Sequence, residues 1–231
     1  IMTNSLSDSL RYRKLFSVSA VLSLLIVICL LGDFFVYALI PNMDSSTEII
    51  KFFIESPVKG LLFFDLLGMI SYLLFITIII SFFILLKKEN ESIILIGTVL
   101  FFIGITVFFA TNTGFSVLRL SREFVATQSE AERQMILSSV KTMITLFDVQ
   151  AFMISYVIVS LAWIFISIAM LRSDMFSKIS SYSGLISGFS AIIAEIFENT
   201  FKELLNASIF FYFIALVALL IFVISTGLRL N

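Results

Sequence analysis

The chain has 231 residues, of which 60% are hydrophobic and 13% are charged, and its formal net charge is −1. A soluble domain has about 45–50% apolar and about 25% charged residues, so a soluble core of this size could not bury the apolar excess and the solvent must be lipid. The near-neutral charge, without a basic stripe interleaved with aromatic residues, gives no basis for a nucleic-acid partner.

Long apolar segments occupy most of the chain. There are six of them, at about 15–40, 61–86, 92–118, 143–170, 179–197 and 207–228. A membrane span needs about 20 apolar residues, so five are long enough and the segment at 179–197 is marginal. Their apolar residues run continuously rather than alternating, which predicts helices. We therefore expect one all-α domain over residues 1–231, a polytopic transmembrane helix bundle with six spans in a lipid bilayer.

The first apolar segment predicts the orientation of the bundle. Arg11, Arg13 and Lys14 precede it, but it exceeds the ~7–15 apolar residues of a signal peptide and lacks an Ala-x-Ala site, so we expect an uncleaved span. With the N-terminus inside, eight Lys and Arg residues are cytoplasmic and seven are outside. The charges beside the first helix usually decide the orientation of the whole bundle. The Lys87-Lys88 turn also favours an N-terminus inside the cell. Both termini are therefore predicted to be cytoplasmic.

Two outer connections carry helical patterns. The stretch "SSTEIIKFFIESP" begins with a capping box, Ser45-x-x-Glu48, and predicts a helix at about 46–55 lying on the membrane surface. Its apolar face consists of Ile49, Ile50, Phe53 and Ile54. Residues 119–142 are expected to continue the third and fourth spans beyond the lipid, with "ATQSEAE" as the turn. The alternative is that both segments only link spans.

Four carboxylates lie within the predicted spans, namely Asp33, Asp65, Asp148 and Glu195. A carboxylate at the centre of a span costs about 2.5–3.5 kcal/mol on insertion scales. At 1.5 Å per residue, however, all four lie roughly 3 to 11 Å from the outer helix ends, in one layer. They predict an acidic pocket that is open to the outside, between the first, second and fourth spans.

A structural interpretation competes with the pocket. Asp65 and Asp148 lie in first helical turns, where the helix dipole stabilises negative charge by about 0.3–1 kcal/mol, and Glu195 could reach water. Asp33 lies near a helix C-terminus, where the dipole opposes its charge, so it should face the bundle interior or a wet cavity, or be protonated. No Lys, Arg or His lies within any predicted span to pair with it, and its expected polar neighbours are Asn112 and Gln150.

Small residues recur in the fifth segment. Ser180, Gly184 and Gly188 follow one another at intervals of four residues. This spacing lets helix backbones approach closely in lipid and predicts helix packing. The partner helix could belong to the same chain or to another chain of a homo- or hetero-oligomer.

The chemistry of common enzyme sites is missing from the sequence. The chain has no histidine, so neither a Ser-His-Asp nor a Cys-His arrangement can form. It has no glycine-rich phosphate loop and no HExxH zinc motif. The single cysteine, Cys29, cannot form an intrachain disulfide. We therefore predict no catalytic residue, no metal ligand and no cofactor, and do not expect an enzyme.

The later half of the chain carries a family resemblance. The stretch "LFDVQAFMISYVIVSLAWIFISIAMLRSDMFSKISSYSGLISG", residues 146–188, has an Asp that opens a helix, a long apolar span and a polar turn. The turn and the residues after it include Leu171, Arg172, Ser173, Phe176, Tyr182, Gly184 and Gly188. This pattern, with the earlier "GDFFVYALIP", resembles the DUF4386 family of prokaryotic multi-spanning membrane proteins. The resemblance implies a compact bundle of about six helices and no established activity.

Two functions lead at this point, and an intramembrane enzyme is a third possibility for which the sequence suggests no activity. The first is an integral protein of the cell membrane, in a prokaryotic plasma membrane, that binds or moves a cation, a proton or a cationic small molecule. Asp33 and Asp65 would be its principal ligands, with help from Asp148. The alternative is a structural or partner-binding subunit that works through the Gly184/Gly188 face and the surface helix.

Overall fold

The computed structural model describes residues 2–39, 43 and 45–230, and this part of the chain contains helices and no strand. The predicted end of the first span, at residue 40, lies outside the described residues. The helices are α1 (Met2–Leu39), α2 (Ser46–Glu55), α3 (Pro57–Phe63), α4 (Leu66–Thr111), α5 (Gly114–Ala126), α6 (Glu130–Leu146), the π-helix η1 (Phe147–Ile154), α7 (Ser155–Leu171), α8 (Lys178–Thr200), the 3₁₀ turn η2 (Lys202–Leu204) and α9 (Leu205–Leu230). The prediction of an all-helical protein is confirmed.

Five helical stretches among the described residues are long and apolar enough to cross a membrane. They are Tyr12–Leu39, Leu66–Ala126, Glu130–Leu171, Lys178–Thr200 and Leu205–Leu230. The second stretch covers most of two predicted spans, 61–86 and 92–118, which lie on either side of a kink in α4 at Asn90.

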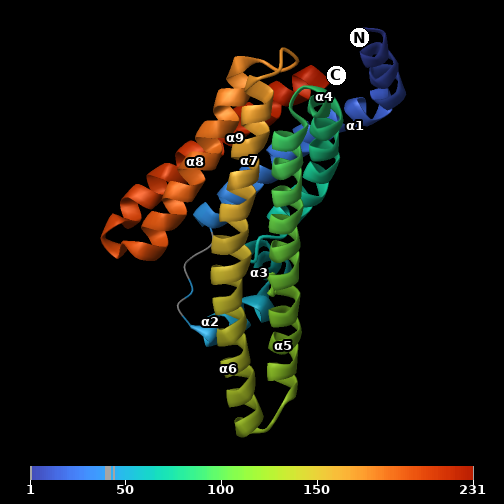
Figure 1. Cartoon of the computed structure of the whole chain (residues 1–231). Coiled ribbons are helices and arrows are strands. Elements are labelled where there is room, and N and C mark those ends of the chain that lie inside the picture. The colour runs from blue at the N-terminus through green and yellow to red at the C-terminus, as the bar shows by residue number, and fades with distance from the viewer. Residues whose placement is uncertain (1, 40–42, 44, 231) are drawn as a thin grey trace.

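Helix α4 is a hairpin rather than a rod. Asn90 has non-helical backbone angles, φ −146° and ψ 56°, and stands in the charged run from Lys87 to Glu91. The halves on either side pack together, since the Tyr72 and Phe108 ring centroids are 5.0 Å apart. Figure 1 shows the chain reversing at this kink. A run of charged residues cannot continue through lipid, and Asn readily leaves the helical conformation, so the reversal falls here.

Small residues allow the helices to pack closely. The first half of α4 packs against α1, where the Ser19 and Ser81 hydroxyls are 2.9 Å apart. The second half packs against α7 at Gly104, whose carbonyl accepts a 2.9 Å hydrogen bond from the Ser155 hydroxyl. A Cβ added at Gly104 would lie 2.5 Å from Val159 Cγ2 and 3.2 Å from its backbone nitrogen. Only glycine therefore fits at this crossing.

An aromatic cluster fills the space between these helices. Trp163 of α7 has ring centroids of Phe75, Phe101 and Phe222 within 5.0, 5.5 and 5.3 Å. Trp163 is 5% exposed, and Phe101 and Phe222 are fully buried. This cluster joins both halves of α4 to α7 and α9.

The short helices gather at one end of the bundle. Helices α5 and α6 form a hairpin that projects beyond the other helices in Figure 1, with α2 beside it. The Ser45 hydroxyl caps α2 by accepting a 3.2 Å hydrogen bond from the Glu48 N–H. Ile49, Ile50 and Phe53 are buried, and α2 packs on α5, α3 and α6. Protein thus covers three of the four residues predicted to lie on the membrane surface, while Ile54 is 44% exposed.

Replacing Gly104 by leucine should destabilise the bundle. The side chain would overlap Val159 where the two backbones meet, and overpacking of this kind costs about 1–3 kcal/mol. The melting temperature of the detergent-purified variant should fall. Ile103→Phe is the matched control, because Ile103 is 47% exposed on the outer face of the same helix. Equal melting temperatures for Gly104→Leu and the wild type would contradict the close crossing.

Candidate functional site

Asp65 stands where α3 ends and α4 begins. Among the described residues other than glycine it alone has a positive φ, with φ 60° and ψ 43°. Asp is one of the few residues that adopt this left-handed conformation, because its side chain can bond locally. Here Asp65 Oδ1 accepts a 3.0 Å hydrogen bond from the Gly68 N–H and caps α4. Asp65 is fully buried.

Asp33 meets Asp65 from α1. The two carboxyl groups lie in hydrogen-bonding contact, and we call them the carboxyl pair. Ionised carboxyl groups only accept hydrogen bonds, so a bond between them needs a proton on one of them. Without that proton, Asp33 Oδ1 and Asp65 Oδ2 are buried atoms that no described donor reaches. The contact therefore has room for one added hydrogen-bonding proton.

Three tyrosines lie within electrostatic range of the carboxyl pair. Tyr37, Tyr72 and Tyr156 each interact electrostatically with both carboxyl groups. The Tyr72 hydroxyl also hydrogen-bonds with the Ser155 side chain. Sequence reasoning missed these residues. A signal was present, since Tyr37 lies four residues after Asp33 and Tyr72 seven after Asp65, on the same helix faces.

Asn112 positions the backbone before Asp65. Its Nδ2 donates a 2.7 Å hydrogen bond to the Phe64 carbonyl, and its Oδ1 accepts a 3.2 Å bond from the Gly114 N–H. The sequence placed Asn112 beside the acids at similar depth. The structure uses it to fasten the end of α4 to the strained turn at Asp65.

Asp148 and Gln150 lie in the π-helix η1. Phe147 packs on Phe64, with ring centroids 4.7 Å apart, which brings this segment to the α3–α4 junction. The Asp148 side chain is exposed and interacts electrostatically with Tyr37 and with Glu198 of α8. Gln150 is half-buried. Short π-helical segments occur often at functional sites.

Glu195 belongs to a different contact. It is 4% exposed, and its Oε1 accepts a 2.8 Å hydrogen bond from the Tyr212 hydroxyl. Its Oε2 accepts a 3.2 Å bond from Asn199. The predicted acidic layer therefore separates into the carboxyl pair, the exposed Asp148 and a satisfied glutamate between α8 and α9.

The small residues of α8 pack within the chain. A Cβ at Gly184 would lie 2.8 Å from the Phe222 ring, and one at Gly188 would lie 2.7 Å from the Ser160 carbonyl. The Ser180 and Ser177 hydroxyls are 2.8 Å apart. The helices packed against these two glycines are α7 and α9 of the same chain.

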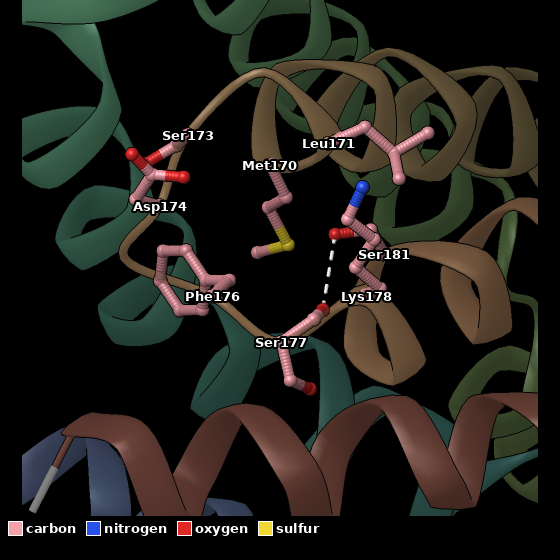
Figure 2. Close-up of a pocket in the computed structure, with 8 residues that line it drawn as sticks. All are labelled: Met170, Leu171, Ser173, Asp174, Phe176, Ser177, Lys178 and Ser181. Atoms are coloured by element: carbon pink, nitrogen blue, oxygen red, sulfur yellow. Dashed lines mark hydrogen bonds between the residues drawn. The ribbon is translucent and has the colours of Figure 1, made fainter.

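Two cavities lie away from the carboxyl pair. One, of about 280 Å³, is at the α7–α8 connection, where the Ser181 hydroxyl donates a 3.2 Å bond to the Ser177 carbonyl (Figure 2). Its lining also includes Met170, Asp174, Phe176 and Lys178. The other, of similar volume, lies between α8 and α9 and has a mostly apolar lining. Neither of these two cavities is lined by Asp33 or Asp65.

Comparison with known proteins identifies a family. The family model described as "Domain of unknown function (DUF4386)" matches residues 18–230, nearly the whole chain. No curated protein and no solved structure matches the chain. With its apolar helices, the protein is an integral membrane protein, and the chain belongs to the DUF4386 family.

Proposed function

We propose that the protein binds a proton or a small cation at the carboxyl pair, within the membrane. The observation that carries this proposal is the contact between the buried Asp65 carboxyl group and the half-buried Asp33 carboxyl group. One buried oxygen of each, Asp33 Oδ1 and Asp65 Oδ2, has no described hydrogen-bond donor. Two carboxylates at 4 Å repel by about 4 kcal/mol at an effective dielectric constant of 20. A shared proton or a bound cation removes that repulsion.

The described surroundings of the pair supply no positively charged side chain to offset its negative charge. Among the described groups that interact with either carboxyl, none is a lysine or an arginine. The Gly68 N–H and the start of α4 stabilise Asp65, but Asp33 stands near the end of α1, where the helix dipole opposes negative charge. A structural role thus explains Asp65 better than it explains Asp33. A positively charged ligand explains both.

The melting temperature of the wild type should depend on pH or on cations, and the Asp33→Asn variant should lose this dependence. A ligand that binds only the folded state stabilises it by mass action, by about 2.7 kcal/mol at 100 times Kd. The wild-type melting temperature should therefore rise toward low pH if the ligand is a proton, and with added cation if it is a metal ion or an amine. Melting temperatures in detergent, from about pH 4 to about pH 9 and with a panel of cations, measure this.

The Glu89→Gln variant is the control for that experiment. Glu89 is exposed beside the α4 kink, so its loss removes one carboxylate without touching the pair. It should keep the wild-type response. Flat curves for both the wild type and Asp33→Asn would overturn the proposal and favour a structural or partner-binding subunit.

Gly68→Ala should weaken the dependence of the melting temperature on pH or cations, although both aspartates are still present. A Cβ at Gly68 would overlap the Asp65 carboxyl group and push it from its place. Gly32→Ala is the matched control beside Asp33, because its Cβ would meet only the flexible end of Leu67, at 3.0 Å. An alanine in either helix should otherwise add stability. A Gly68→Ala protein that responds like the wild type would contradict the dependence on this geometry.

We also propose six spans with both termini cytoplasmic, in the plasma membrane of a prokaryotic cell. The α4 hairpin supports the count, since each half is long enough to cross the lipid. In Figure 1 both chain ends lie at the same end of the bundle as the α4 kink and the α7–α8 connection. Helix α2 and the α5–α6 hairpin lie at the opposite end. The carboxyl pair, near the α3–α4 junction, would then belong to the outward half.

Cysteine labelling in intact cells checks this topology. In a Cys29→Ala background, Gln128→Cys at the α5–α6 turn should react with a membrane-impermeant maleimide. Glu89→Cys beside the kink should react only after the membrane is opened. The reversed pattern would invert the orientation, and labelling of both sites from one side would reject a six-span count.

A further inference from the structure

The cavity at the α7–α8 connection has no part in the site at the carboxyl pair. Its volume is about 280 Å³, and its lining mixes apolar side chains such as Met170 and Phe176 with polar and charged ones. We propose that it binds the headgroup of a phospholipid that carries a phosphate and a primary ammonium group, with the phosphate at Lys178 and the ammonium at Asp174. This inference goes beyond the proposed function and does not depend on it.

The backbone around the cavity is held by its own contacts. Phe176 is buried, and its ring packs against Phe82 of α4 with centroids 5.5 Å apart. The Ser173 hydroxyl accepts a 3.1 Å hydrogen bond from the Met175 N–H, and the Ser177 side chain caps α8. The connection between α7 and α8 is therefore fastened at three points, and the cavity is formed before a ligand arrives.

Two side chains of opposite charge line the cavity. Figure 2 shows Asp174 and Lys178 on opposite sides of it, and both are exposed. Neither forms an ion pair with another described residue. Arg172 is also exposed in this connection, but it is not part of the lining. A ligand with one charge of each sign complements both side chains, whereas a simple anion or cation would meet one like charge.

Each charge of such a headgroup has a natural position in the cavity. Lys178 is the first residue of α8, and the N–H groups at a helix N-terminus add partial positive charge to that of the ammonium, so the phosphate belongs there. On the opposite side, the Asp174 carboxylate accepts hydrogen bonds from a primary ammonium, which has three N–H donors. Hydrogen bonds of this charge-assisted kind are about twice as strong as neutral ones.

The cavity lies at the level of lipid headgroups. Helices α7 and α8 both belong to stretches that are long and apolar enough to cross a membrane. Residues 172–177, which join them, must therefore emerge at a membrane surface. Ligand pockets commonly have volumes of about 300–1,000 Å³. A cavity of about 280 Å³ thus suits a small group such as phosphoethanolamine.

An apolar stripe on α8 favours a lipid over a free zwitterion. Tyr182, Ile186 and Phe189 follow Lys178 on the same helix face, and they are 54%, 50% and 54% exposed. The stripe runs from the cavity toward the centre of the membrane. Acyl chains attached to a headgroup at Lys178 would lie along it, and a free zwitterion would leave it unused.

Native mass spectrometry of the detergent-purified full chain tests the inference. The probes are phosphatidylethanolamine, phosphatidylcholine and phosphatidylglycerol with identical acyl chains. Choline has no N–H donor for Asp174, and the glycerol headgroup has no cation. The wild type should therefore bind phosphatidylethanolamine with a Kd about 10-fold lower than for either other lipid, because a hydrogen bond to a charged group contributes about that much or more.

Two variants separate the two ends of the headgroup. Asp174→Asn should bind phosphatidylethanolamine only as well as phosphatidylcholine, since it loses the ammonium contact. Lys178→Met should weaken binding of both lipids about 10-fold, because both carry the phosphate. Both residues are exposed, so both variants should fold and keep the wild-type melting temperature.

Matched controls lie at the α4 kink. Glu89→Gln and Lys88→Met remove one exposed charge of each sign at the same end of the bundle in Figure 1. Both should keep the wild-type order of lipid affinities. Glycerophosphoethanolamine, which is the headgroup without acyl chains, should displace the lipid only at a concentration at least about 100-fold higher, because it lacks the apolar contacts.

The other outcomes would overturn the proposal. Equal Kd values for the three lipids, or wild-type binding by both Asp174→Asn and Lys178→Met, would remove the site. Tighter binding of phosphatidylglycerol, strengthened further by Asp174→Asn, would make the cavity a site for an anionic lipid. Displacement by glycerophosphoethanolamine at the concentration of the lipid would make it a site for a free zwitterion.

Discussion

The contact between Asp33 and Asp65 constrains much of the structure around it. It requires α1 to end beside the turn that joins α3 to α4, and it holds Asp65 in a left-handed conformation stabilised by the Gly68 N–H. Asn112 fastens the Phe64 carbonyl behind that turn, and Phe147 packs on the Phe64 ring. Four separate parts of the chain thus converge around one pair of carboxyl groups.

The rest of the bundle is assembled by close approach rather than by charge. Lipid is as apolar as the side chains, so helices associate through packing and interhelical hydrogen bonds. Gly104 and Gly188 bring α7 within backbone contact of α4 and α8, and serine hydroxyls bond across the helices. Against this apolar background, the buried Asp65 and the half-buried Asp33 have few polar partners other than each other.

The sequence was sufficient for the helical elements but not for their partners. Apolar length predicted the membrane helices, and the capping box at Ser45 predicted α2, because both signals are local. The face of α2 was assigned to the membrane, since nothing local reveals that α5 covers Ile49 and Phe53. The kink at Asn90 lay within a charged run that the sequence marked as a turn. Asn90 alone leaves the helical conformation there.

The candidate site was predictable only in part, because the sequence shows where residues lie along a helix but not which helices meet. Depth along each helix placed the four acids in one layer, but rotation about each helix axis decides which of them meet. Asp33 and Asp65 face each other, whereas Glu195 turns to Tyr212, and a one-dimensional pattern does not contain that rotation. Tyr37 and Tyr72 were not predicted as site residues, because tyrosines near helix ends are common in membrane proteins. Their spacing from the aspartates was the one available signal.

The position of Trp163 has a practical consequence. It is the single tryptophan of the chain, and it packs among Phe75, Phe101 and Phe222, where both halves of α4 meet α7 and α9. The protein thus carries its own optical label at the centre of the bundle. Its fluorescence comes from one dry, aromatic environment. A shift in its emission maximum therefore reports separation of these helices without an added dye.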